Sequence, residues 1–158
     1  MTKRPRAWME EGGGFTLMEL VIVTMIIGIL SAVAAPRFAE ALAEYRVEAA
    51  AAQIRSDLTE ARLQAKITSA AQTVQFDDAA EAYTLVGVPD IDHPGQDRRI
   101  LLLSRFKASI DSVDCGGDAE LAFDGYGIPD SSAEIVITCG NRQRTVTVAQ
   151  ETGLAGVQ

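Results

Sequence analysis

Hydrophobic and polar positions divide the chain into three stretches of different periodicity. Residues 15–35 are apolar except for Glu19, and residues 20–36 contain no charged side chain. At 1.5 Å per residue, a helix over residues 15–35 is long enough to cross the roughly 30 Å hydrocarbon core of a bilayer. Three cations precede this run, and by the positive-inside rule they place the N-terminus in the cytoplasm and the bulk of the chain outside: Lys3, Arg4 and Arg6.

The apolar pattern changes beyond Pro36 but does not end. Residues 37–67 are rich in Ala, Glu, Leu, Arg and Gln, which favour helix. Apolar side chains recur there at spacings of three and four, as a helical stripe does: Val47, Ala51, Ile54, Leu58, Ala61 and Ala65. The helix is therefore predicted to continue to about Ala70 and to pack on a core through this stripe. Charged residues are expected on its other faces, where Arg55, Asp57, Glu60 and Arg62 offer local pairs. Pro36 removes one helical hydrogen bond and is expected to kink the helix without ending it.

After residue 71 the pattern shortens to that of strands. Six segments are short, β-branched or aromatic, and bounded by Gly, Pro, Asp or Asn: QTVQFD, AYTLVGV, RILLLS, ELAFD, AEIVITC and RTVTVAQ. Gly140 and Asn141 separate the last two and predict a hairpin. Strict alternation over residues 145–148 favours a sheet with one buried face. One long helix laid on an antiparallel sheet predicts an α+β domain.

The apolar run by itself admits two ordinary interpretations. It could be an uncleaved signal anchor, or a cleaved secretory signal peptide with its cleavage site among the small residues 31–35. A signal peptide would have to carry Glu10, Glu11 and Glu19 in its n-region. Neither interpretation explains Glu19, because a carboxylate at the centre of a membrane helix costs about 2.5–3.5 kcal/mol on insertion scales.

The sequence GGGFTLMEL, residues 12–20, resembles the type III signal of type IV pilins and type II secretion pseudopilins. In that family a short basic leader ends in glycine and is followed by a hydrophobic first mature residue, a glutamate four residues later and a continuous apolar helix. The matching positions include two at which the family loosens its helix: Gly14, Phe15, Thr16, Leu17, Glu19, Gly28 and Pro36. The resemblance implies a leader peptide (1–14), a transmembrane and assembly helix (15–36) and a periplasmic pilin-like α+β domain (37–158).

The resemblance also implies roles for these residues. A prepilin peptidase would cleave after Gly14 and N-methylate Phe15. Glu19 would then pair with the Phe15 ammonium of a neighbouring subunit and set the register of assembly, since a buried charge without a partner is costly. The implied partners are the peptidase, other pilins or pseudopilins through the N-terminal helix, an inner-membrane assembly platform and membrane lipid. The implied location is the inner membrane, crossed once, with the C-terminal domain in the periplasm.

The C-terminal half looks most like the H-type minor pseudopilins and the related FimT-like minor pilins. Residues 123–157 show that group's Phe-Asp then Gly pattern, a final hairpin and a closing Thr152-Gly153. The resemblance implies a minor pseudopilin of the type II secretion pseudopilus. The alternative is a FimT-like minor pilin of a type IV pilus, which could bind DNA for uptake.

Net charge bears on that alternative. The formal net charge of the whole chain is −8 at pH 7, and residues 1–14 contribute +1, so residues 15–158 have a net charge of −9. Such an acidic surface repels phosphate backbones, which makes a nucleic-acid partner unlikely. Cations outside the long helix are the only candidates for a DNA surface: Arg98, Arg99, Arg105, Lys107, Arg142 and Arg144.

Catalytic and metal-binding chemistry is nearly absent from the sequence. His93 is the single histidine and nothing near it supports a nucleophilic triad, so we expect no enzyme activity and no cofactor. The segment DIDHPGQD resembles a calcium loop, but Pro94 and Leu101 stand where oxygen ligands are needed. We therefore expect no metal site. Cys115 and Cys139 flank a predicted strand, and in an oxidising compartment a disulfide between them is favoured.

Overall fold

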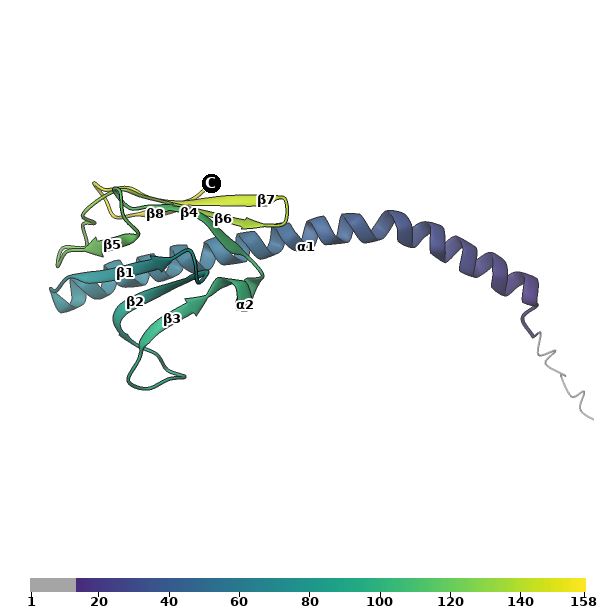
Figure 1. Ribbon diagram of the computed structural model, residues 1–158, viewed down its shortest axis with the longest axis horizontal. Coiled ribbons are helices and arrows are strands. Elements are labelled where there is room, and N and C mark those ends of the chain that lie inside the picture. Colours follow the sequence, from purple (N-terminus) through teal and green to yellow (C-terminus); the bar gives the residue numbers. More distant parts are fainter. Residues whose placement is uncertain (1–13) are drawn as a thin grey trace, which may run out of the picture. The chain divides into compact units, whose positions relative to one another are not determined.

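The structure is a computed structural model that describes residues 14–158 (Figure 1). The predicted leader lies outside the described residues, except for Gly14. The chain divides into two units, one ending at Phe38 and one from Ala39 to Gln158. Helix α1 (Leu17–Thr68) supplies residues to both units and includes Pro36 without interruption.

Within residues 14–158, the rest of the regular structure lies in the second unit. After α1 come β1 (Gln72–Asp77), β2 (Ala82–Pro89), β3 (Asp97–Leu101), α2 (Leu102–Phe106), β4 (Ser109–Asp114), β5 (Glu120–Phe123), β6 (Ala133–Cys139), β7 (Arg142–Val148) and β8 (Ala155–Val157). The strands form two four-stranded sheets, in the orders β3-β2-β1-β5 and β4-β6-β7-β8. Neighbouring strands in both sheets are antiparallel.

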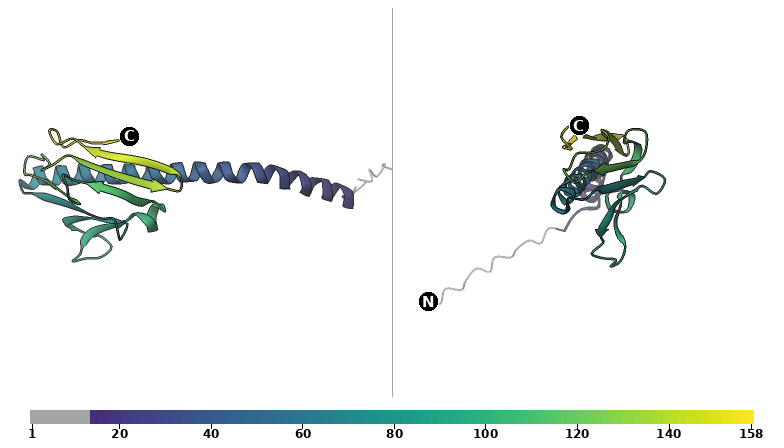
Figure 2. Two further views of the ribbon diagram at one scale, coloured as in Figure 1. Left: turned by 45° about the horizontal axis from the view of Figure 1, so that its top comes forward. Right: turned by 90° about the vertical axis from the view of Figure 1, so that its left-hand side faces the viewer.

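The core of this unit lies between the sheets and one face of α1 (Figure 2). Every residue of the predicted stripe is buried there, together with Ala50. Half of the stripe is alanine, so the strands can approach the helix closely at those positions. Inward-facing side chains of both sheets complete a single apolar cluster: Val74, Leu85, Leu121, Ile135, Ile137 and Val146. The predicted α+β fold is confirmed.

Two details differ from the sequence-based expectation. The strands form two sheets where one was expected, because strand partners are chosen by contacts between distant parts of the chain. The segment RILLLS was expected to be one strand, but β3 ends at Leu101 and α2 begins at Leu102. A short apolar run suits a strand and a buried helical turn equally well.

The hairpin prediction is confirmed: Cys139 pairs with Arg142 across a two-residue turn, and Gly140 has a φ of 63°.

Candidate assembly site

The predicted cleavage site lies just before the start of α1. Gly14, Phe15 and Thr16 are outside the helix, which begins at Leu17. The Thr16 hydroxyl oxygen accepts a hydrogen bond from the Glu19 backbone N–H at 3.1 Å, so Thr16 acts as the N-cap. Thr and Glu three residues apart form the sequence pattern of a capping box. The Gly14–Phe15 peptide bond is therefore held outside the helix, with Phe15 82% exposed.

Glu19 lies in the first turn of α1 and its side chain is exposed. A carboxylate there interacts favourably with the positive end of the helix dipole. This gives Glu19 a role within its own helix in addition to any pairing between subunits. Sequence reasoning considered only the second role, although Thr16 three residues earlier was a visible signal for the first.

The rest of the first unit is a helix with apolar side chains on all faces. Its large apolar residues are exposed from Phe15 to Val33, and α1 contains a stretch long and apolar enough to cross a membrane. A β-carbon at Gly28 would meet nothing within 4 Å. A helix that is apolar all round is suited to lipid or to a bundle of similar helices. The roles predicted for Gly14, Phe15, Glu19, Gly28 and Pro36 stay predictions.

In the second unit, four of the six cations that could have served a DNA surface are paired with carboxylates, while Arg105 and Lys107 form no ion pair within residues 14–158. Arg142 lies 3.3 Å from Glu44, and Arg144 contacts both Glu44 and Glu48, the latter at 2.8 Å. These ion pairs attach the β6–β7 hairpin to α1. They also raise the pKa of Arg144, chiefly through the hydrogen bond to Glu48, so its charge is fixed.

The other candidate cations near a sheet edge are paired in the same way. Arg98 makes two hydrogen bonds to Glu60, at 2.8 and 3.0 Å, which raise the pKa of Arg98. Arg99 lies 3.1 Å from Asp77. Sequence reasoning had paired Glu60 with neighbours on its own helix, but its partner comes from β3.

A buried polar network lies next to Arg98. Although its side chain is ionisable, Asp57 lies on the buried face of α1 and is only 4% exposed. Its carboxylate accepts hydrogen bonds from Gln53 Nε2 at 3.0 and 3.1 Å and from the Tyr83 hydroxyl at 2.5 Å, and it lies 3.7 Å from Arg98. Burial and the Asp57 charge raise the pKa of Tyr83, so the phenol stays protonated. Sequence reasoning had placed Asp57 on a solvent-facing side of the helix, which is wrong.

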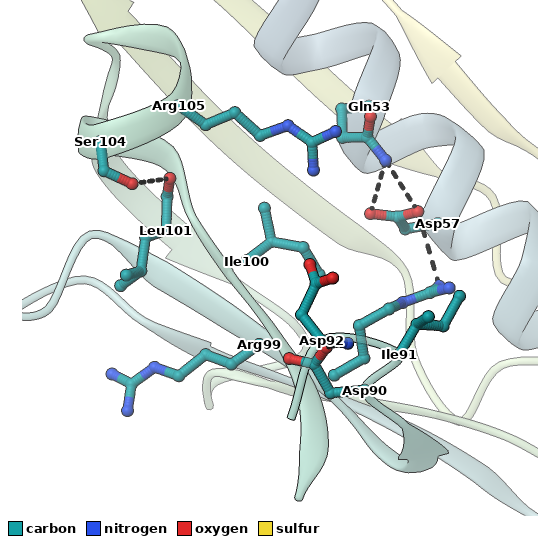
Figure 3. Close-up of a pocket in the computed structure, with 11 residues that line it drawn as sticks. Gln53, Asp57, Asp90, Ile91, Asp92, Arg99, Ile100, Leu101, Ser104 and Arg105 are labelled. Carbon is teal, nitrogen blue, oxygen red and sulfur yellow. Dashed lines mark hydrogen bonds and ion pairs between the residues drawn. The ribbon is translucent and has the colours of Figure 1, made fainter. Parts of the chain in front are cut away.

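Asp57 and Gln53 also line an open polar cavity of about 420 Å³ (Figure 3). Its wall includes residues of the β2–β3 loop and of β3 and α2, among them Asp92 and Arg105. Within the loop, Asp90 accepts hydrogen bonds from the backbone N–H groups of Asp92 and His93 at 2.8 and 3.3 Å. Because Asp57 and Asp90 bond to their own neighbours, they work as structural groups in this conformation.

The predicted disulfide is wrong. Cys115 and Cys139 are both free and buried. Pairing of Ser109 with Thr138 and of Asp114 with Glu134 puts the two cysteines at opposite ends of β6. That strand separates them by roughly 20 Å at about 3.3 Å per residue, whereas the Cα atoms of a disulfide lie within about 7 Å. Burial, with Asp118 and other nearby carboxylates, raises the pKa of the Cys115 thiol to about 12.

Comparison with known proteins gives a likeness in structure alone. No protein-family model and no curated protein matches the sequence. Two crystal structures of the type IV minor pilin FimU from Pseudomonas aeruginosa PAO1 are similar to this chain. The first has a TM-score of 0.55 and 16% sequence identity, and the match covers 71% of this chain and 87% of FimU. The second has a TM-score of 0.53 and 17% sequence identity, and the match covers 70% of this chain and 91% of FimU. At this level of identity, the comparison assigns the chain a type IV pilin-like fold.

Proposed function

We propose that this chain is a minor pseudopilin, a subunit of the periplasmic pseudopilus of a type II secretion system. In this proposal a prepilin peptidase cleaves after Gly14 and methylates the new amino group of Phe15. One observation carries the proposal: an accessible Gly14–Phe15 bond stands directly before a capped helix whose residues 17–36 are uncharged except for Glu19 in the first turn. The pilin-like fold of the second unit supports it.

The apolar helix would serve the subunit twice. Before assembly it anchors the chain in the inner membrane, with the leader in the cytoplasm and the second unit in the periplasm. After assembly the same apolar surface packs against the helices of other pseudopilins. Glu19 then meets the Phe15 ammonium of a neighbour, and this pair selects the register because a mismatch would leave both charges unpaired in an apolar bundle.

The proposed role is structural, and we infer no enzymatic activity. The buried ionisable groups support this inference. The Asp57 carboxylate already accepts hydrogen bonds from Gln53 and Tyr83 and lies in an ion pair with Arg98, so it is poorly suited to accept a proton from a substrate. The proposed partners are accordingly the prepilin peptidase, other pilin-type subunits, an assembly platform and lipid.

The alternative is a minor pilin of a type IV pilus, which the pilin-like fold shared with FimU supports equally. A DNA-binding version of that alternative is less well supported. Binding to phosphate backbones needs several cations free to displace counterions. Arg98, Arg99, Arg142 and Arg144 are each engaged by carboxylates of this chain.

Mass spectrometry of the N-terminus tests the proposal. The full chain, expressed in cells with a prepilin peptidase, is expected to begin with N-methyl-Phe15. Gly14→Val is the matched control: it should remain membrane-inserted and keep its leader, because insertion depends on the apolar run. A wild-type protein that keeps Met1, or that begins at Ala35 or Pro36, contradicts the proposal. The subunits that copurify with the chain then distinguish the two candidate functions: pseudopilins indicate a type II secretion system, and pilus subunits indicate a type IV pilus.

A further inference from the structure

Residues 39–46 of α1 belong to the second unit but lie outside its apolar core. The first buried residue of the helix is Val47, and none of residues 39–46 is buried. Among these eight residues, Ala43 is the one that packs partly buried against the core. Apolar burial therefore contributes little to holding these two turns of helix on the sheets.

The same stretch of α1 begins a row of carboxylates on one face of the helix. Glu40, Glu44 and Glu48 follow one another at a spacing of four residues. Like charges at this spacing destabilise a helix, so the row opposes the helical state of its own segment. The other cations nearby on α1 form no ion pair within residues 14–158: Arg37, Arg46 and Arg55.

Two arginines of the β6–β7 hairpin, which lies along α1 in Figure 1, neutralise this row. Arg142 lies 3.3 Å from Glu44 and 3.8 Å from Glu40. Arg144 lies 2.8 Å from Glu48 and also contacts Glu44, so both arginines share Glu44. We call these five side chains the hairpin latch. They are 30–58% exposed, so dissolved salt can screen their attraction.

The hairpin offers residues 39–46 little else to hold. At its turn, a β-carbon at Gly140 would lie 3.8 Å from Cβ of Ala43, but glycine has no side chain to pack there, and Asn141 is exposed. Within residues 14–158, the latch contacts are the only side-chain hydrogen bonds or ion pairs that residues 39–46 make. The attachment of these two turns therefore depends mainly on charge.

We propose that the hairpin latch is a salt-sensitive device that holds residues 39–46 of α1 on the second unit. The attractions act over less than 4 Å and the repulsions over roughly 6 Å of helix, so salt removes more attraction than repulsion. The two turns then detach while the core from Val47 onward stays folded. In a pilin-type subunit this would lengthen the part of α1 that is free to pack on other helices; that consequence alone rests on the proposed function.

Amide hydrogen exchange of the full chain in detergent micelles tests the latch. Mass spectrometry follows peptides from residues 39–46, and peptides from the buried stretch 50–61 serve as the internal reference. Raising NaCl from about 0.05 M to about 1 M should speed exchange in residues 39–46 roughly fivefold, the size expected for a few exposed ion pairs. Exchange in residues 50–61 should not change.

Charge variants give the second readout. The chain carrying both Arg142→Gln and Arg144→Gln should show the fast exchange already at low salt, and added salt should have little further effect. Glu44→Gln removes the shared carboxylate and keeps a good helix former, so it should speed exchange even where the double variant disturbs the sheet. Arg99→Gln breaks the ion pair with Asp77 elsewhere in the unit and is the matched control, which should leave residues 39–46 unchanged.

Three results overturn the latch. The first is equal exchange in residues 39–46 of the wild type and of both latch variants. The second is a salt effect as large in the double variant as in the wild type. The third is an equal acceleration in residues 50–61, because the whole unit would then be opening. None of these measurements requires cleavage after Gly14, so their outcome is independent of the N-terminal mass that tests the proposed function.

Discussion

Replacing Tyr83 by phenylalanine isolates one hydrogen bond of the buried Asp57 network. Tyr83 is 1% exposed and Asp57 4%, so the hydrogen bond that is removed is almost fully buried. The phenylalanine keeps the ring, including its tilted contact with Phe76 at a centroid distance of 5.8 Å. The loss in the free energy of unfolding therefore reports the hydroxyl and little else.

The magnitude follows from the charge on the acceptor. A hydrogen bond to a charged group contributes about 1.5–3 kcal/mol. Asp57 keeps Gln53 and Arg98 as partners after the change, so we expect the lower part of that range, about 1.5–2 kcal/mol. For a domain of this size the melting temperature should fall by roughly 5–8 °C.

Urea unfolding of residues 39–158 measures this loss, since this unit contains the whole apolar core. Far-UV circular dichroism is the suitable signal because the single tryptophan, Trp8, lies outside the unit. Tyr45→Phe, at an exposed position, is the control and should stay within about 0.5 kcal/mol of wild type. In an Asp57→Asn background, Tyr83→Phe should cost less, because a neutral acceptor forms a weaker bond. A Tyr83→Phe loss no larger than that of the control would refute the reasoning.

Two further predictions concern the cysteines and the loop on the end of α1. Cys115 and Cys139 should resist labelling by maleimide at neutral pH in the native protein, since both are buried and the thiolate is the reactive form. In urea without reductant, mass spectrometry should find both cysteines labelled. A disulfide-linked Cys115–Cys139 peptide would contradict the structure. Gly127→Ala should destabilise the unit by about 1–3 kcal/mol in urea unfolding, because a β-carbon would clash with Lys66 and φ is 73°. Gly87→Ala, also at positive φ but with open space around it, is the control for the clash and should cost less.

The sequence predicts those parts of the fold that depend on local pattern. The stripe from Val47 to Ala65 repeats with the helical period, and all its predicted members are buried. The turn at Gly140 needs a positive φ, which glycine adopts without strain, so the β6–β7 hairpin is predicted as well. In both cases the information lies within a few residues of the feature.

The failed predictions depend on partners far away in the chain. Cys115 and Cys139 are close in sequence, but the pairing of β4 with β6 separates them. Asp57 is predicted to face solvent because it is charged, and its burial follows from Tyr83 and Arg98, which approach from β2 and β3. A charged residue inside an apolar helical stripe, such as Asp57, therefore indicates that a polar partner from a distant part of the chain packs against it.

The pairing of charges also bears on how an acidic subunit could meet its neighbours. Arg98, Arg99, Arg142 and Arg144 are engaged by carboxylates within the second unit, so they add stability to the subunit and little attraction between subunits. Two acidic copies repel each other unless uncompensated cations lie at the contact. Within the described residues of the second unit, six cations form no ion pair: Arg46, Arg55, Arg62, Lys66, Arg105 and Lys107. In the proposed filament, electrostatic attraction to a neighbouring acidic chain would therefore have to come from these cations, which lie on α1 and on or next to α2, and not from the arginines of β3 and β7.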